Sequence, residues 1–333
     1  MDSLTQIVLG AAVGEVVLGK KVGNKAMFYG AIAGTIPDLD VLARNFTDTI
    51  TATELHRGFS HSIVFALLMA PLLGWLVDRI HHKQASWKGW TLLFFWGLST
   101  HPLLDIFTTW GTQLFWPSEW RLAFNSIFVI DPLYTLPFLI CILIAAFRKR
   151  GSLSRKRINH AGLIISSAYL LLTLVLKFAV HQQFEAALAE QHIDYRQIST
   201  RPSPLNTILW NANVETEDAY LIGDYSFFDT QPIAFQSYPK QRERAQQWIQ
   251  KPNVQRLINI AQGWYLITEE EGQWHFNDLR FGLIPIDPEQ PQFVFRYALS
   301  LNEQGEVVAT EDRPTPEDTS AVFSTLWQRI CGN

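Results

Sequence analysis

The stretch that decides the fold class is 127–147, IFVIDPLYTLPFLICILIAAF, which a basic loop separates from 161–181, AGLIISSAYLLLTLVLKFAVH. Each stretch has roughly 20 mostly apolar residues, the length that a helix needs to cross a hydrocarbon core about 30 Å thick. Four more apolar segments come earlier in the chain, at 4–18, 26–36, 61–78 and 90–107. We therefore expect a mainly α protein with a polytopic membrane bundle of about six helices.

The first two apolar segments are short and rich in glycine. Gly10 and Gly14 lie in the first segment, and Gly30 and Gly34 lie in the second. Small residues let two membrane helices approach closely, so this pair is expected to form a tight hairpin. The sequence leaves open whether these two helices span the bilayer completely.

The basic residues of three loops indicate the orientation in the membrane. They gather between alternate pairs of segments, in the loops that contain Lys20, Lys21 and Lys25, then Arg79, Lys83 and Lys88, then Arg148, Lys149, Arg150, Arg155, Lys156 and Arg157. Loops rich in lysine and arginine remain in the cytoplasm. The opposite face then holds the N-terminus, residues 37–60, residues 108–126 and everything after about 182.

The composition changes after the last apolar segment. Residues 1–185 are expected to form the membrane domain, and 186–333 a soluble α+β domain on the periplasmic side. Short strand-like runs occupy 206–213, 219–227, 263–268, 279–284 and 293–299, with helices expected near 240–261 and 318–330. A net charge of −4 without a basic stripe gives no reason to expect nucleic acid. The two cysteines, Cys141 and Cys331, form no disulfide framework.

Three short motifs carry the chemistry: PDLD at 37–40, HRGFSHS at 56–62 and HPLLD at 101–105. Each has an ordinary explanation by itself, as a turn, a polar loop or a hydrogen-bonded pair. Together they are more informative, because the charge-based topology places all three at one membrane face. His101 and Asp105 are four residues apart, so on a helix both side chains lie on the same side.

Imidazole and carboxylate groups suit zinc, manganese or iron, and a pair of aspartates can bridge two ions. Ionisable residues at membrane depth are costly and by default indicate function. We therefore predict a divalent metal site, most simply one or two zinc ions. The predicted ligands are Asp38, Asp40, His56, His61, His101 and Asp105.

Two neighbouring residues are candidates for catalytic roles. The guanidinium of Arg57 has the geometry to clamp a phosphate, although an ion pair with a nearby carboxylate is an equal alternative. Glu54 is a candidate base, with an exposed loop acid as the alternative. Three other polar residues have two alternatives each: Glu15 either faces the site or pairs with a polar neighbour, and Arg121 and Asp131 either orient substrate or ligands or, as we expect, have simple loop roles. The remaining histidines are expected to be ordinary polar residues or to belong to the cytoplasmic loop: His81, His82, His160, His181, His192 and His275.

The order PDLDVL, HRGFSHS, HPLLDIFTTWG and Trp116-Pro117 resembles the YdjM-like family of bacterial inner-membrane proteins, over about residues 1–135. The resemblance implies an inner-membrane, metal-dependent hydrolase with a helical core, distantly similar to zinc-dependent phospholipase C and P1 nuclease. It also implies the same six ligand residues. One departure concerns the first helix, where this chain has Thr5-Gln6 and the family pattern often has Thr-His. That departure weakens the case for a site with three ions.

These observations favour a membrane hydrolase that cleaves a phosphoester of a lipid or lipid-linked substrate with metal-activated water. The choice of substrate rests on the distant fold resemblance. One alternative is a non-catalytic membrane protein with a structural or sensory metal site and a periplasmic domain that binds a partner. A second alternative is an ion transporter, which the clustering of ligands at one face disfavours. A zinc peptidase is disfavoured because HExxH is absent. The sequence does not indicate an oligomeric state.

Overall fold

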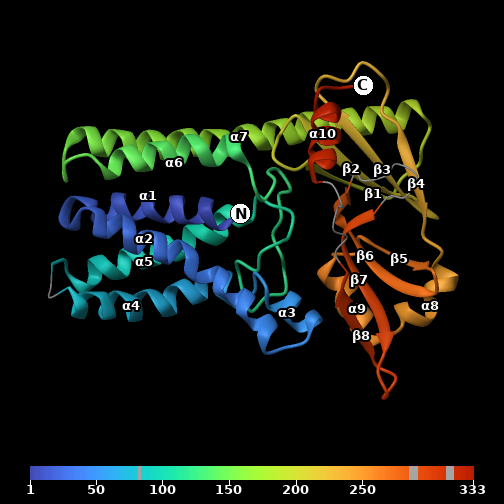
Figure 1. Ribbon diagram of the computed structural model, residues 1–333, viewed down its shortest axis with the longest axis horizontal. Helices are drawn as coiled ribbons and strands as arrows, with labels where there is room; N and C mark the ends of the chain where they lie inside the picture. The colour runs from blue at the N-terminus through green and yellow to red at the C-terminus, as the bar shows by residue number, and fades with distance from the viewer. Residues whose placement is uncertain (82–83, 285–291, 313–318) are drawn as a thin grey trace. The chain divides into compact units, whose positions relative to one another are not determined.

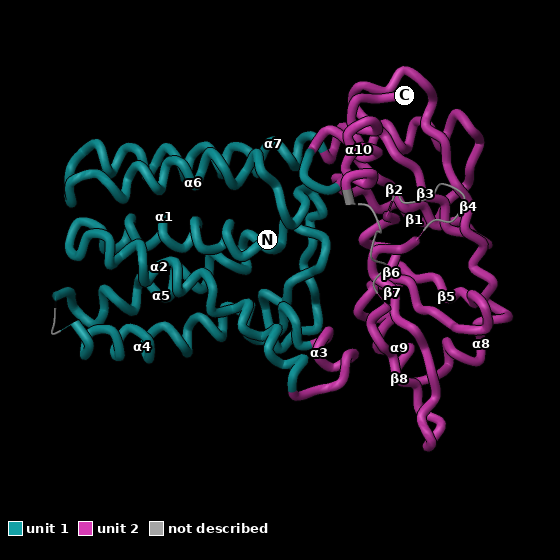
Figure 2. Tube along the Cα trace, in the orientation of Figure 1, with its two compact units in different colours: residues 1–45, 55–176, 204–206 teal, residues 46–54, 177–203, 207–333 magenta. Residues whose placement is uncertain are grey.

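The computed structural model describes residues 1–81, 84–284, 292–312 and 319–333. It divides into two compact units, which Figure 2 shows in different colours. The helical unit comprises Met1–Asn45, Leu55–Leu176 and Pro204–Asn206, and the C-terminal unit comprises Phe46–Glu54, Lys177–Ser203 and Thr207–Asn333. His82 and Lys83 of the predicted cytoplasmic loop, and position 318 of the last predicted helix, lie outside the described residues.

Every apolar segment predicted from the sequence overlaps one α-helix, and these helices belong to the helical unit except for the part of α7 after Leu176 (Figure 1). In chain order these helices are α1 (Ser3–Val22), α2 (Asn24–Thr35), α4 (Ile63–Ile80), α5 (Trp87–Asp105), α6 (Pro132–Ala146) and α7 (Leu153–Glu190). Two 3-10 helices, η1 (Ile36–Asn45) and η2 (Phe59–His61), join them. Within the described residues, α1, α4 and α7 are long and apolar enough to cross a membrane, and α6 is apolar but shorter. The count of six crossings stays a prediction.

Side-chain caps fix the starts of four of these helices. Asp2 accepts a hydrogen bond from the amide of Thr5, and Ser62 accepts one from the amide of Phe65. Ser86 caps α5 in the same way, and Asp131 accepts from two amides at the start of α6. Such caps satisfy amide groups that a helix leaves unpaired at its N-terminus. Asp131 therefore has a structural role in the first turn of α6.

Helices α1 and α2 form a close hairpin, and glycine makes that closeness possible. A Cβ atom at position 10 or 14 would clash with the carbonyl oxygen of Gly30 or Ala26 on the facing helix. Likewise, a Cβ atom at position 34 would lie against the carbonyl oxygen of Gln6. The absence of side chains along this line brings the two backbones into contact, as expected for small residues between membrane helices.

A buried ion pair joins α1 to the start of α7. Arg155 Nε and Nη2 donate to the two carboxylate oxygens of Glu15, at 2.6 and 2.5 Å, and Nη1 donates to Asn24 at 2.7 Å. The Arg155 side chain is 2% exposed. Among the alternatives for Glu15, the structure therefore shows the one in which it pairs with a polar neighbour.

The C-terminal unit contains two four-stranded antiparallel sheets. The first has the order β1 (Gln197–Pro202), β2 (Leu209–Glu215), β3 (Ala219–Ser226), β4 (Phe235–Pro239), and the second has β5 (Tyr265–Glu270), β6 (Gln273–Ile284), β7 (Gln292–Leu301), β8 (Val307–Glu311). Its helices are α3 (Thr49–Leu55, up to Glu54 in this unit), α8 (Arg242–Ile249), α9 (Pro252–Ile260) and α10 (Thr319–Ile330). The core under the second sheet includes Trp248, Leu257, Phe276 and Tyr297.

Details of the C-terminal unit differ from the sequence prediction. The helix expected at 240–261 is two helices, because Pro252 has no amide hydrogen and begins a new helix at its first position. The strands β1, β4 and β8 were not expected. All three lie at sheet edges and are short, and β1 (QISTRP) and β4 (FQSYP) carry little apolar alternation. Hydrophobic periodicity is the main signal for a strand, so such segments are hard to recognise.

The glycine contact between α1 and α2 leads to a stability prediction. Replacing Gly14 with Ala places a methyl group against the backbone of Ala26, so the helices must move apart. We expect a loss of about 1–3 kcal/mol, the usual cost of overpacking. Thermal unfolding of the detergent-solubilised protein should show a lower melting temperature. Val16→Ala, on the exposed side of α1, is the matched control and should change it little. An unchanged melting temperature in G14A would contradict this packing.

Candidate metal centre

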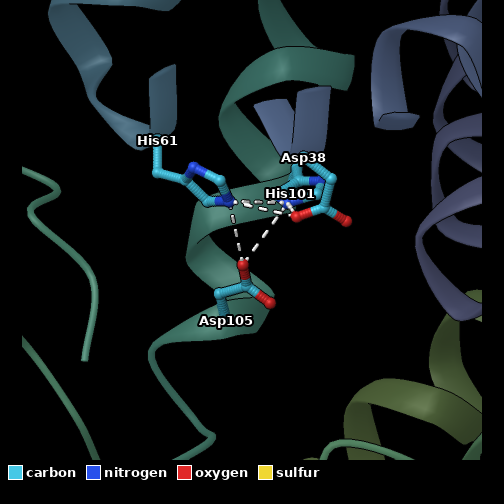
Figure 3. A group of neighbouring side chains, drawn as sticks. All are labelled: Asp38, His61, His101 and Asp105. Carbon is cyan, nitrogen blue, oxygen red and sulfur yellow. Dashed lines mark hydrogen bonds and ion pairs between the residues drawn. The ribbon is translucent and has the colours of Figure 1, made fainter. Parts of the chain in front are cut away.

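Four side chains from three separate parts of the helical unit meet at one point (Figure 3). Asp38 comes from η1, His61 from the end of η2, and His101 and Asp105 from the last turns of α5. One ligand atom from each residue lies within 4.8 Å of the other three. His61, His101 and Asp105 are buried, whereas the Asp38 side chain is 23% exposed. The cluster is therefore reachable from the side of Asp38.

Five of the six distances between the ligand atoms match a tetrahedral metal site, and the sixth, between the oxygens of Asp38 and Asp105, is at most 4.8 Å. Nε2 of His61 lies 3.1 Å from Nε2 of His101, and both nitrogens lie 3.4 Å from Oδ1 of Asp38. The same two nitrogens lie 3.4 and 3.3 Å from Oδ2 of Asp105. Zinc bonds of 2.0–2.1 Å in a tetrahedron require ligand atoms about 3.3–3.4 Å apart. All five distances are close to that value.

The other ring nitrogens are held so that both Nε2 atoms face the cluster. Nδ1 of His101 donates to the carbonyl oxygen of Gly34 at 2.6 Å. Nδ1 of His61 lies 3.2 Å from Asp40 and 3.0 Å from the hydroxyl of Ser60, which itself donates to Asp40. Because a carbonyl or carboxylate only accepts, these contacts place the hydrogen on Nδ1. A neutral ring then presents a lone pair on Nε2, the usual arrangement for a metal-binding histidine.

Asp105 provides a test of whether a cation fits. Its Oδ1 accepts from Gln6 Nε2 at 3.1 Å, lies 3.4 Å from Arg57 Nη2, and contacts the ammonium of Met1. Its Oδ2 is buried and, as long as the two facing Nε2 atoms carry no hydrogen, has no hydrogen-bond donor among the described residues. A buried polar atom without a partner is costly. An ion between this oxygen and the two Nε2 atoms would satisfy it, so the residues present fit a divalent metal.

The acidic groups also change the proton affinity of their neighbours. Burial raises the pKa of Asp40, but hydrogen bonds from His56 and His61 outweigh burial and hold that pKa well below its usual range. Burial lowers the pKa of His61, but hydrogen bonds with Asp105, Asp38 and Asp40 raise it to about 10. His61 precedes the first residue of α4 and lies outside the candidate spans. Without a metal, both ring nitrogens of His61 therefore carry a proton at neutral pH.

Two of the predicted ligands occupy a second layer around the cluster. Asp40 accepts from His56 Nδ1 at 2.9 Å and from the amide of Arg57 at 2.9 Å. Neither Asp40 nor His56 belongs to the four residues whose ligand atoms converge. In a 3-10 helix, with three residues per turn, positions two apart face different directions. The structure therefore does not bring Asp38 and Asp40 together as a bridging pair.

The two predicted catalytic residues are both held in ion pairs. The guanidinium of Arg57 is buried, donates to Thr108 at 2.7 Å and lies beside Asp105, so the structure shows the ion pair that the sequence left as an alternative. Glu54 belongs to the C-terminal unit, where Arg256 donates to both of its carboxylate oxygens, at 3.0 and 2.6 Å. Arg57 thus contacts the cluster through Oδ1 of Asp105, whereas the contact of Glu54 lies within the C-terminal unit.

Several contributors were not recognised in the sequence. Ser60 and Gly34 orient the histidines, and Thr108 holds Arg57. Gln6 is fully buried and donates to both Asp105 and the carbonyl oxygen of His101. Its position in the family pattern was the only signal. Arg121 donates to the carbonyl oxygens of His56 and Gly111, a loop-supporting role.

Comparison with known proteins identifies the family. The family model described as YdjM inner membrane protein matches residues 1–180. The chain belongs to this family. It is also 36% identical over 104 residues to the inner membrane protein YbcI of Escherichia coli (strain K12), a match that covers 31% of this chain and 59% of that relative. No solved structure matches the chain, so the distant similarity to zinc-dependent phospholipase C and P1 nuclease stays a prediction.

The second layer leads to a prediction about metal affinity. Asp40→Asn weakens the acceptor that orients His61 but removes no converging ligand atom. We expect zinc to bind about 10–100-fold more weakly, the usual effect of losing such a partner. His101→Ala should instead abolish stoichiometric binding. Calorimetric titration of metal-free protein with zinc measures both effects. Equal losses in the two variants would contradict the division into two layers.

The proton on His61 leads to a pH prediction. A metal must displace this proton, and the pKa of about 10 keeps the proton bound below that pH. Apparent metal affinity should therefore rise by about tenfold per pH unit between pH 6.5 and 8.5, with one proton released on binding. Titrations with cobalt, followed by absorbance at several pH values, test this. An affinity that is independent of pH would be inconsistent with a protonated His61.

Proposed function

We propose that this protein is a metal-dependent hydrolase of the bacterial inner membrane that cleaves a phosphoester of a lipid or lipid-linked substrate. The convergence of His61, His101, Asp105 and Asp38 at tetrahedral spacing carries the proposal. Two imidazoles and two carboxylates suit zinc better than calcium or magnesium, which prefer oxygen ligands. A bound zinc ion would lower the pKa of water and polarise the ester oxygen.

Exposed apolar side chains in η1, which carries Asp38, and in the loop after α5 support an amphiphilic substrate. Leu39 and Leu42 of η1 are exposed, as are Phe115, Trp116 and Trp120 in the loop between α5 and α6. Aromatic residues of this kind are enriched where a membrane meets water. A lipid could keep its tails among these side chains while its headgroup reaches Asp38, the partly exposed member of the cluster.

The basic loops support a periplasmic site. Lys20 and Lys21 occupy the last turn of α1, whereas the N-terminal end of α1 lies beside Asp105. Twenty residues of helix separate the two ends by about 30 Å, roughly the thickness of the hydrocarbon core. With the lysines in the cytoplasm, the cluster falls on the periplasmic side.

His56 is the best-placed residue for proton transfer in this proposal. Asp40 fixes its Nδ1, and its side chain is 31% exposed and packs against Trp110. Burial lowers the pKa of His56, and Asp40 raises it in part, so the ring is neutral near pH 7. A neutral histidine with a fixed tautomer can accept a proton from water or return one to a leaving group.

One observation favours a second function, a structural or sensory metal site. Structural zinc sites have four protein ligands, whereas catalytic sites use three and keep one position for water. The cluster offers four ligand atoms. Catalysis therefore requires Asp38, the most exposed of the four, to yield its position or to share it with water. The C-terminal domain would otherwise be the part that acts, through a binding partner.

The decisive experiment compares activity, metal content and folding in purified protein. Metal-free and zinc-loaded protein is assayed with phosphatidylglycerol in mixed micelles and with bis-p-nitrophenyl phosphate. We expect zinc-dependent release of product, with His101→Ala reducing turnover by at least about 100-fold and removing the metal. His56→Ala should retain zinc but lose roughly 100–10,000-fold in turnover, the usual contribution of a proton-transfer group.

His160→Ala, which changes a histidine on α7 that bonds only to a backbone carbonyl in the described structure, is the matched control and should leave both properties unchanged. Zinc binding without product release from either substrate, together with a lower melting temperature in His101→Ala, would favour the structural site. Wild-type protein that holds no stoichiometric metal would exclude both functions.

A further inference from the structure

The C-terminal unit includes a short segment from the N-terminal half of the chain. Residues Phe46–Glu54 belong to it, although the chain on either side belongs to the helical unit (Figure 2). This segment connects two parts of the metal centre. Asp38 and Asp40 precede it, and His56 and His61 follow it. The family match ends at residue 180, so nothing in the comparisons gives the C-terminal domain a role.

Specific contacts hold the segment in the C-terminal unit. Ile50 is 2% exposed and lies in the same core as Trp248, Leu257 and Phe276. Arg256 of α9 donates to both carboxylate oxygens of Glu54 and, at 2.9 Å, to the hydroxyl of Thr51. A guanidinium that grips a carboxylate with two hydrogen bonds is a strong and directional contact.

The helix within this segment depends on those contacts. α3 has seven residues, and its first turn is capped by Asp48, which accepts from the amides of Ile50 and Thr51. Isolated helices shorter than about 12–15 residues are marginal in water, because nucleation is costly. Burial of Ile50 and the ion pair with Arg256 therefore keep the segment ordered.

Residues that flank the segment on its two sides are hydrogen-bonded to each other at the candidate metal centre. Asp40 accepts from Nδ1 of His56 and from the amide of Arg57, across 16 and 17 residues of sequence. A flexible connection of that length makes such contacts entropically costly. An ordered connection removes much of that cost in advance.

We propose that the C-terminal domain pre-organises the metal centre by holding α3. Weakening its contacts with Glu54 and Ile50 then also weakens the hydrogen bond between Asp40 and His56. The domain thus positions ligand-supporting residues without contributing a ligand atom. Any binding event that changed the stability of the α9 region would change the order of the centre through the same connection.

Hydrogen exchange in the full-length, metal-free protein tests this proposal, and it needs neither metal nor substrate. In Arg256→Gln, we expect the amides of 49–55 and the amide of Arg57, which is bonded to Asp40, to exchange at least about tenfold faster. The matched control is Arg244→Gln. It removes another Arg–Glu pair of the same unit, with Glu269, and should change neither region. The expected result does not depend on hydrolase activity, so this proposal and the proposed function can fail separately.

Charge reversal distinguishes a specific loss of the contact between Glu54 and Arg256 from a general loss of folding. Glu54→Arg and Arg256→Glu should each accelerate exchange at both places, and the double variant should restore slow exchange at both. Faster exchange of α3 without any change at Arg57 would overturn the proposal, because the segment would then be docked but not coupled. The proposal also fails if α3 is unaffected by Arg256→Gln, or if the double variant restores α3 and not Arg57.

Discussion

The candidate metal centre depends on two hydrogens, one on Nδ1 of His61 and one on Nδ1 of His101. Gly34 and Asp40 accept those hydrogens, and the lone pairs on Nε2 consequently point at each other and at two carboxylates. Four electron-rich atoms so close together repel one another unless a proton or a metal ion lies among them. Arg57 and Gln6 contact the other oxygen of Asp105 and so hold its carboxylate in place. The four atoms are thus kept in an arrangement that a bound cation makes favourable.

The bundle around this centre is assembled by two different physical means. The α1–α2 hairpin uses missing side chains to bring backbones together, and dispersion contacts stabilise it. The contact between α1 and α7 instead uses full charges, with every oxygen of Glu15 paired to Arg155. The glycine contacts form the hairpin that places Gln6 at the site. The ion pair between Glu15 and Arg155 fixes the other end of the same helix, α1. Together they hold α1 in register with α5, which supplies His101 and Asp105.

Much of the helical unit was predictable because its signals are local. Apolar length locates the helices, and the i, i+4 spacing of His101 and Asp105 places two ligands on one helical face. The division of roles between Asp38 and Asp40 was not predictable, since it depends on η1 being a 3-10 helix. Glu54 was a candidate base with an exposed loop acid as the alternative, and its carboxylate binds Arg256, which lies 202 residues away and which no local pattern indicates. Edge strands such as β1 and β4 lack the apolar periodicity that would reveal them.

The ion pair between Glu15 and Arg155 also has a consequence for how the protein is made. The two residues are 140 positions apart in the chain. At a synthesis rate of about 5–20 residues per second, Glu15 emerges from the ribosome roughly 7 to 28 seconds before its partner. During that interval an acidic side chain within an apolar helix has no arginine to neutralise it, and a charge at that depth is expensive. Full insertion of α1 is therefore unfavourable until the start of α7 has been translated. Before then, α1 is expected to stay at the membrane surface or beside the insertion machinery.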